Sequence, residues 1–187
     1  MKLIVCPFQK ISNPLIPEDF YLKPDTALAK PGDDFYWPLT CAKLKYSLCY
    51  IIRIDRLGRA IKPAFASRYY KDANVGINIS GLKTVVDFKF WPAGTMLDYS
   101  LHMPRMFYPK EDITHLDLQI DERKKVTYQI PGEEEVCNKI SLLSHFIYLK
   151  MGDMILMELH KPQPVKNGMH IRVIPCIDFY IKKHIGQ

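Results

Sequence analysis

The chain has 187 residues, a formal net charge of +6 at pH 7, and a composition that is 48% hydrophobic and 12% aromatic. A chain of this length and composition can bury a sizeable core without disulfides, which excludes an intrinsically disordered protein. Its basic residues are scattered, whereas nucleic-acid-binding proteins carry a concentrated basic stripe or a recognisable module. We therefore expect no nucleic-acid partner, and an attraction for a small anionic ligand at most.

The cysteine spacing and the lengths of the apolar segments indicate the cellular compartment of the protein. The five cysteines are Cys6, Cys41, Cys49, Cys137 and Cys176. Their odd number and the lack of a C-x-x-C spacing favour neither a disulfide framework nor a zinc site. The apolar run at residues 3–6 is too short for a signal peptide, and no stretch approaches the roughly 20 apolar residues of a membrane span. We expect a protein of the reducing cytoplasm with no membrane association.

Fourteen prolines and nine glycines divide the whole chain into short segments, which favours strands and turns over a helical bundle. Strands are predicted at residues 3–6, 20–22, 35–37, 44–56 and 74–80, with a proline-rich loop over 9–19 and a short helix within 63–71. The segment 44–56 gives the strongest strand signal, because β-branched and aromatic residues dominate it. Residues 81–105 show no clean periodicity.

The second half predicts a hairpin, one helix and further strands. Residues 113–120 and 124–130 alternate across a polar turn, and 154–159 and 171–181 are strands, the last broken at Pro175. Residues 133–149 have helical spacing and begin with three glutamates, which the positive end of a helix dipole favours. The predicted fold class is therefore α+β and mostly β.

Several stretches, in order, resemble the fumarylacetoacetate hydrolase family. They are the F-x-K-P-like segment 20–28 with Gly32 and Pro38, the strand 46–54, the strand 75–78, the hairpin entry 109–113, and the L-x-x-G-D-x-I-like segment 149–155. Each is weak alone, but their order covers nearly the whole chain. The resemblance implies mixed β-sheets rolled around a central pocket, a single domain over 1–187 with a shortened N-terminal segment 1–19, and a homodimer.

The same resemblance exposes what is missing from the family's active site. The family holds a divalent cation on a Glu-x-Glu pair and a distant aspartate; the matching positions here are Ser47, Cys49 and Asn78. These positions carry no carboxylate to offset the dehydration of a hard cation. The position of the family's catalytic lysine falls near Met96, and the nearest lysine is Lys89.

Two further family elements are also absent. No histidine stands in residues 6–13, where the lid histidine of the family would fall, and 157–160 replace its T-G-T-P loop. The resemblance therefore implies a degenerate site with no metal and no cofactor, because four separate parts of it are lost together.

Three residues keep a chemical alternative open. Cys49 is either a small buried hydrophobic residue, which we favour, or a nucleophile that needs a histidine such as His102 or His160 beside it. Glu158 and His160 are either exposed polar residues at a strand end or a new acid–base pair. They are weak catalytic candidates.

We weigh three functions. The favoured one is a catalytically inactive protein with this family's fold, a pseudoenzyme that acts as a dimeric binding or scaffold protein. The alternative is a hydrolase or isomerase of small acidic keto compounds that uses a rearranged site. The third is a structural protein without a small ligand. A hydrolase-family likeness would describe the fold, since function depends on the site and not on the fold.

Overall fold

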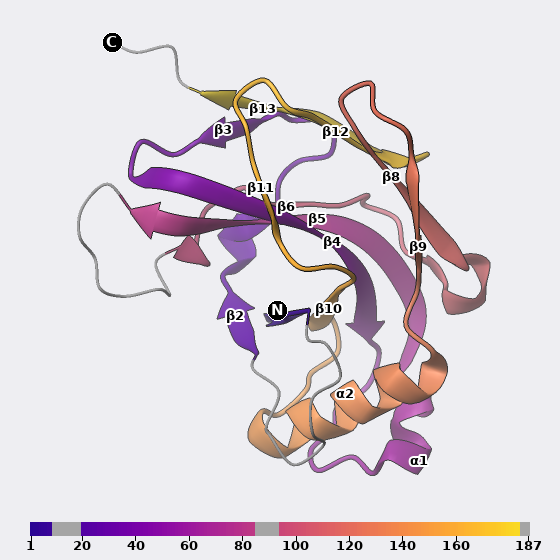
Figure 1. Ribbon diagram of the computed structural model, residues 1–187. Helices are drawn as coiled ribbons and strands as arrows, with labels where there is room; N and C mark the ends of the chain where they lie inside the picture. Colours follow the sequence, from indigo (N-terminus) through magenta and orange to yellow (C-terminus); the bar gives the residue numbers. More distant parts are fainter. Residues whose placement is uncertain (9–19, 85–93, 184–187) are drawn as a thin grey trace.

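The computed structural model describes residues 1–8, 20–84 and 94–183, and its largest element is a curved eight-stranded sheet (Figure 1). The strands run in the order β2-β1-β10-β4-β5-β6, while β11 pairs with β4 and β7 with β5. Their bounds are β1 Leu3–Cys6, β2 Tyr21–Lys23, β4 Cys41–Ile54, β5 Tyr70–Thr84, β6 Leu101–His102, β7 Tyr108–Pro109, β10 Met154–Glu158 and β11 Gln163–Pro164. The pairing is mixed, because β1 runs parallel to β10 while β4 is antiparallel to both β5 and β10.

A second sheet and a helix cover the first sheet. The five-stranded sheet has the order β3-β13-β12-β8-β9, with bounds β3 Phe35–Trp37, β8 His115–Ile120, β9 Val126–Gln129, β12 His170–Ile174 and β13 Ile177–Lys183. The helices are α1 Pro63–Ala66 and α2 Glu133–Phe146, with 3₁₀ turns η1 Asp25–Ala27, η2 Ser67–Tyr69 and η4 Lys110–Asp112. Figure 1 shows the smaller sheet above β4 and β5, and α2 below β10.

Three clusters of buried side chains reflect this arrangement. One joins the two sheets and includes Phe35, Leu48 and Phe179. A second joins the eight-stranded sheet to α2 and includes Ile52 and Ile140. The third lies on the opposite face of the eight-stranded sheet; its members include Leu3, Val5, Cys49, Ile51, Leu101 and Leu156. Because alternate residues of a strand point to opposite faces, β4 serves all three clusters.

The turn before β10 shows what the L-x-x-G-D stretch does physically. Gly152 has φ of +87°, a conformation that L side chains rarely adopt. The buried carboxylate of Asp153 accepts hydrogen bonds of 2.8 Å from the backbone N–H groups of Lys2 and Lys150, and its other contact is the Lys2 ammonium at 2.5 Å. The aspartate therefore fastens β1 to the turn that positions β10.

Most of the expected elements are present, and the mostly β, mixed-sheet fold class is confirmed. The predicted hairpin is β8 with β9, and the predicted helix is α2, which ends at Phe146. The expected helix within 63–71 is shorter than predicted, because β5 begins at Tyr70. The loop predicted over 9–19 and Lys89 lie outside the described residues.

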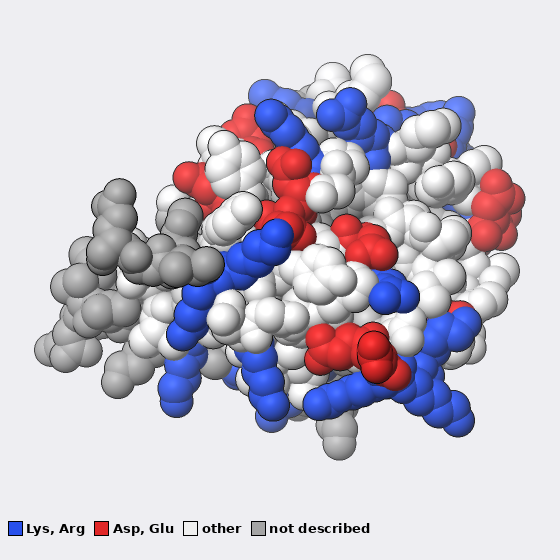
Figure 2. All heavy atoms as spheres, turned by 90° about the horizontal axis from the view of Figure 1, so that it is seen from above, with Lys and Arg blue, Asp and Glu red and all other residues white. Residues whose placement is uncertain are grey.

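Two further observations concern membranes and charged partners. No helix among the described residues is long and apolar enough to cross a bilayer. On the face shown in Figure 2, acidic and basic side chains are interspersed.

Candidate functional site

Four polar side chains meet on one face of the eight-stranded sheet, at its central strands. Ser47 and Cys49 come from β4, Asn78 from β5 and Glu158 from β10. Ser47 lies directly opposite Asn78 in the β4–β5 pair, and Cys49 opposite Glu158 in the β4–β10 pair. Directly opposed residues of antiparallel strands share a face, so all four point to the side of the third core cluster. Each is less than a tenth exposed.

The carboxylate of Glu158 is the hub of this cluster. Its Oε1 accepts a hydrogen bond of 2.6 Å from the Ser47 hydroxyl and one of 3.0 Å from the Asn78 amide. Its Oε2 accepts a hydrogen bond of 3.2 Å from the backbone N–H of Phe8. Three donors therefore satisfy the two carboxylate oxygens, which is how a protein makes a buried charge tolerable.

Strand β2 adds two residues that the sequence did not single out. Tyr21 and Lys23 alternate along β2 and lie opposite Val5 and Leu3 of the third core cluster. The Tyr21 hydroxyl accepts a 3.0 Å hydrogen bond from Asn78, and the Lys23 ammonium donates one of 3.0 Å to the Ile79 carbonyl. The sequence did contain a signal for this placement. Tyr21 and Lys23 are two apart in the F-x-K-P-like segment, and alternate residues of a strand point to the same face.

Burial sets the protonation of this cluster. Removal from water lowers the pKa of Lys23 from 10.5 to about 7, although the nearby Cys49 and Glu158 act in the opposite direction. Burial, together with the charge of Glu158, raises the pKa of the Cys49 thiol well above its usual value. The same two causes raise the pKa of Tyr21. At neutral pH the cluster therefore contains a neutral thiol, a neutral phenol and a lysine near its titration midpoint.

The other sequence candidates lie elsewhere. Met96 is 56% exposed, whereas the clustered residues are buried. His160 follows the end of β10 and points to the opposite face, where its ring packs against Tyr46 and Tyr128 and its Nε2 accepts from the backbone N–H of Leu48. Glu158 and His160 do not form a pair, and both are buried rather than exposed as the simpler expectation had it.

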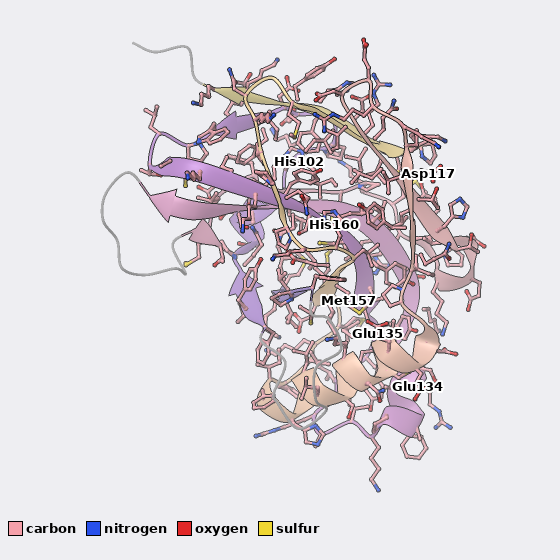
Figure 3. All side chains as sticks on the ribbon, viewed as in Figure 1. His102, Asp117, Glu134, Glu135, Met157 and His160 are labelled. Carbon is pink, nitrogen blue, oxygen red and sulfur yellow. The ribbon has the colours of Figure 1, made fainter. Side chains whose placement is uncertain are left out.

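Neither histidine proposed to activate Cys49 lies on its face of the sheet. His102 stands opposite Ile77 in the β5–β6 pair and stacks on Phe179 at 3.7 Å between ring centroids, in the space between the two sheets (Figure 3). Burial lowers the pKa of His102 to about 4, so it is neutral. His102 and His160 therefore cannot act as general bases toward Cys49 in this arrangement.

A slow thiol is the expected consequence at Cys49. With no cationic activator except a half-titrated lysine, and with a pKa raised by burial, Cys49 should react with iodoacetamide at pH 7.5 more than tenfold more slowly than free cysteine. The half-buried Cys176 serves as the internal comparison. Peptide mass mapping over time gives both rates, and alkylation of Cys49 as fast as free cysteine would restore it as a nucleophile.

The donor set of the cluster does not fit a hard divalent cation. Magnesium and manganese sites use several oxygen ligands with more than one carboxylate, and this cluster offers one carboxylate, a hydroxyl and an amide beside a lysine. The carboxylate is already hydrogen-bonded to Ser47, Asn78 and Phe8. Among the described residues, no group of three or more histidine, cysteine, aspartate or glutamate side chains could hold a metal.

Comparison with known proteins places the fold. At the level of sequence, no family model and no curated protein matches the chain. Solved structures do match. The 5-carboxymethyl-2-hydroxymuconate delta-isomerase from Mycobacterium smegmatis is 18% identical with a TM-score of 0.75, covering 100% of this chain and 80% of that one. The fumarylpyruvate hydrolase from Pseudomonas aeruginosa, solved with Mn²⁺ and pyruvate, is 17% identical with a TM-score of 0.70, covering 97% and 88%.

A third match carries the family name. A structure described as a fumarylacetoacetate hydrolase family protein from Yersinia pestis CO92 is 15% identical with a TM-score of 0.73, over 96% of this chain and 91% of that one. Similarity at these identities establishes architecture and not activity. The curved mixed sheet, its covering five-stranded sheet and these structural matches together show that the chain has the fold of the fumarylacetoacetate hydrolase family.

Proposed function

We propose that this protein does not carry out metal-dependent catalysis and acts as a homodimeric binding or scaffold protein for a small anionic ligand. The observation that carries the proposal is the Glu158 carboxylate, whose oxygens are bonded to Ser47, Asn78 and Phe8 at 2.6, 3.0 and 3.2 Å. A cation would have to break these bonds and compete with the lysine nearby. The proposal extends to one domain over 1–187 and to a cytoplasmic location.

The neighbours in fold suggest the ligand class. One is named for hydrolysis of fumarylpyruvate and holds pyruvate in its structure. Small oxo acids of this kind are anionic at neutral pH, and the basic balance of the chain, +6, attracts anions. The buried Lys23 supplies positive charge that interacts with Cys49 and Glu158 of the cluster.

Titration calorimetry with Mg²⁺ and Mn²⁺ tests the proposal. Without paired carboxylates we expect no binding heat up to millimolar metal, and no metal-dependent turnover of fumarylpyruvate. Light scattering on the same sample should give twice the mass of one chain. Saturable metal binding that disappears in Glu158→Gln, accompanied by turnover, would contradict the proposal.

A second function has one observation in its favour. Lys23 and Glu158 are two titratable side chains that share a buried cluster, and catalytic sites gather such groups. This favours the alternative of a hydrolase or isomerase of small acidic keto compounds with a rearranged, metal-independent site. Turnover of fumarylpyruvate in the presence of a chelator, lost in Glu158→Gln, would support it over the binding protein.

A further inference from the structure

We propose that the Lys23 amine is a carbonyl-capturing group, which condenses reversibly with the keto carbon of a small 2-oxo acid to form an imine inside the central cluster. This inference rests on the proposed function and names its ligand class. It requires no metal. Lys23 acts electrostatically on Cys49 of this cluster, and 3% of the residue is exposed.

The position of Lys23 is fixed by its strand. Lys23 lies opposite Leu3 of the third core cluster in the β1–β2 pair. Its side chain extends to the carbonyl of Ile79, to which the ammonium donates a hydrogen bond of 3.0 Å. An ammonium carries three N–H groups, and one of them has this bond. The carbonyl it reaches is next in sequence to Asn78, so the amine and the Glu158 network meet at β5.

The surroundings favour the neutral amine. Only an unprotonated amine has the lone pair that attacks a carbonyl carbon, and burial lowers the pKa of Lys23 to about 7. At pH 7 the unprotonated fraction is then on the order of a thousandfold larger than for a lysine in water, whose pKa is about 10.4. This difference is large enough for a carbonyl compound to react with Lys23 in preference to the many lysines on the surface.

The chemistry balances within the cluster. The nitrogen lone pair bonds to the keto carbon, the carbonyl oxygen takes up a proton, and the nitrogen loses one, which gives a carbinolamine. The hydroxyl then takes up a further proton and leaves as water while the nitrogen forms the double bond, which gives the protonated imine. The overall change is amine plus oxo acid plus one proton to protonated imine plus water. The protonated imine is a cation like the ammonium it replaces, and the nearby Glu158 carboxylate stabilises it.

Asn78 supplies an independent observation. Its Oδ1 is buried and has no hydrogen-bond partner among the described residues, while its Nδ2 donates to both Glu158 and Tyr21. Buried acceptors in native proteins are nearly always paired. The hydroxyl of a carbinolamine brings the missing kind of donor into the cluster.

Borohydride trapping tests this inference. The intact protein, treated with a chelator, is incubated with sodium pyruvate and sodium cyanoborohydride at pH 7 and mapped by peptide mass spectrometry. We expect one saturable reduced pyruvate adduct, located on Lys23, that forms at least a hundredfold faster than on the exposed Lys124. Adducts spread over surface lysines, or none, would overturn the proposal in the wild-type protein without any variant.

Two variants and a pH series sharpen the result. Lys23→Met should abolish the adduct, whereas the matched exposed change Lys124→Met should leave it intact. The titratable groups that share this face are Cys49, Glu158 and Tyr21. Cys6 lies on the other face of the sheet, with α2, and acts electrostatically on Tyr21. The trapping rate should rise with a midpoint near pH 7, and Glu158→Gln should move that midpoint lower, because it removes a charge that favours the ammonium. An unmoved midpoint would contradict the statement that the Glu158 charge stabilises the protonated form of Lys23.

The two proposals fail separately. Metal binding by calorimetry would end the metal-free proposal and leave a Lys23 adduct standing in chelated protein. An absence of adduct together with an absence of metal heat would end this inference and leave the proposed function standing.

Discussion

A combined variant with Ser47→Glu, Cys49→Glu, Asn78→Asp and Glu158→Gln should bind Mn²⁺ with a dissociation constant of about 0.1–1 mM, the range of weak protein sites for hard cations. The first three changes supply carboxylates at positions that the strand register places on one face. The fourth removes the carboxylate that already occupies that face through its 2.6 Å bond to Ser47. Loss of the free Mn²⁺ signal in electron paramagnetic resonance measures the binding.

The fourth change, Glu158→Gln, follows from the tertiary structure and would not be part of a design based on sequence alone. With Glu158 retained, four carboxylates would crowd one buried face, and their mutual repulsion would raise their pKa values and weaken the fold. The triple variant without Glu158→Gln should therefore express less well and unfold at a lower temperature than the quadruple variant.

The matched control keeps the side-chain volumes and removes the charge. Ser47→Gln with Cys49→Gln and Glu158→Gln, leaving Asn78 unchanged, should fold like the quadruple variant and bind no Mn²⁺. If the quadruple variant is folded by circular dichroism and yet binds no more Mn²⁺ than this control, the three positions do not converge on a cation.

Between pH 7 and pH 8.5 the free energy of unfolding of the wild type should rise by roughly 1.5 kcal/mol relative to that of Lys23→Met. The folded-state pKa of Lys23 is lowered to about 7, below the value of 10.5 for a lysine in water. Between these two values the unfolded chain binds more protons than the folded one, so stability increases with pH, by at most about 1.4 kcal/mol per unit for one proton. Below pH 7 both states are protonated and the charged lysine's burial cost is fully present.

The difference between the wild type and Lys23→Met isolates Lys23 from other titrations. The buried His102, with a pKa of about 4, affects stability mainly below pH 7. Cysteines such as Cys49 and Cys137 have raised pKa values in the folded state, so they lower stability as the unfolded thiols ionise, from about one unit below their pKa of about 8.5. Lys23→Met keeps every cysteine, so the difference between the two proteins cancels this contribution. Urea unfolding at several pH values, with the exposed Lys124→Met as control, measures the slope. A slope that persists in Lys23→Met would assign it to another group.

Local patterns were sufficient for most of the fold. The β-branched run 44–56 became β4, the acidic start of 133–149 became the first turn of α2, and the alternating 113–120 and 124–130 became the β8–β9 hairpin. Such signals depend on contacts between near neighbours in the chain, which a sequence displays directly. The helix expected within 63–71 was cut short because Tyr70 pairs with Ile54 of β4, a contact between distant residues.

The resemblance stated from the sequence also anticipated the fold, and it placed Ser47, Cys49 and Asn78 at one site. Whether those residues form a functional site remains a prediction that the reconstructed variant tests. The sequence showed that carboxylates are missing at all three positions, since residue identity needs no coordinates.

The tertiary structure alone decided which charges occupy that place instead. Glu158 and His160, two apart in sequence, lie on opposite faces because β10 ends at Glu158 and the chain turns. Glu158 meets Ser47 across 111 residues and Asn78 across 80, and Lys23 reaches Ile79 across 56. Only strand order and register bring these residues together. Only burial on that face lowers the pKa of Lys23, because desolvation depends on the whole packed sheet and not on the neighbours of one residue in the chain.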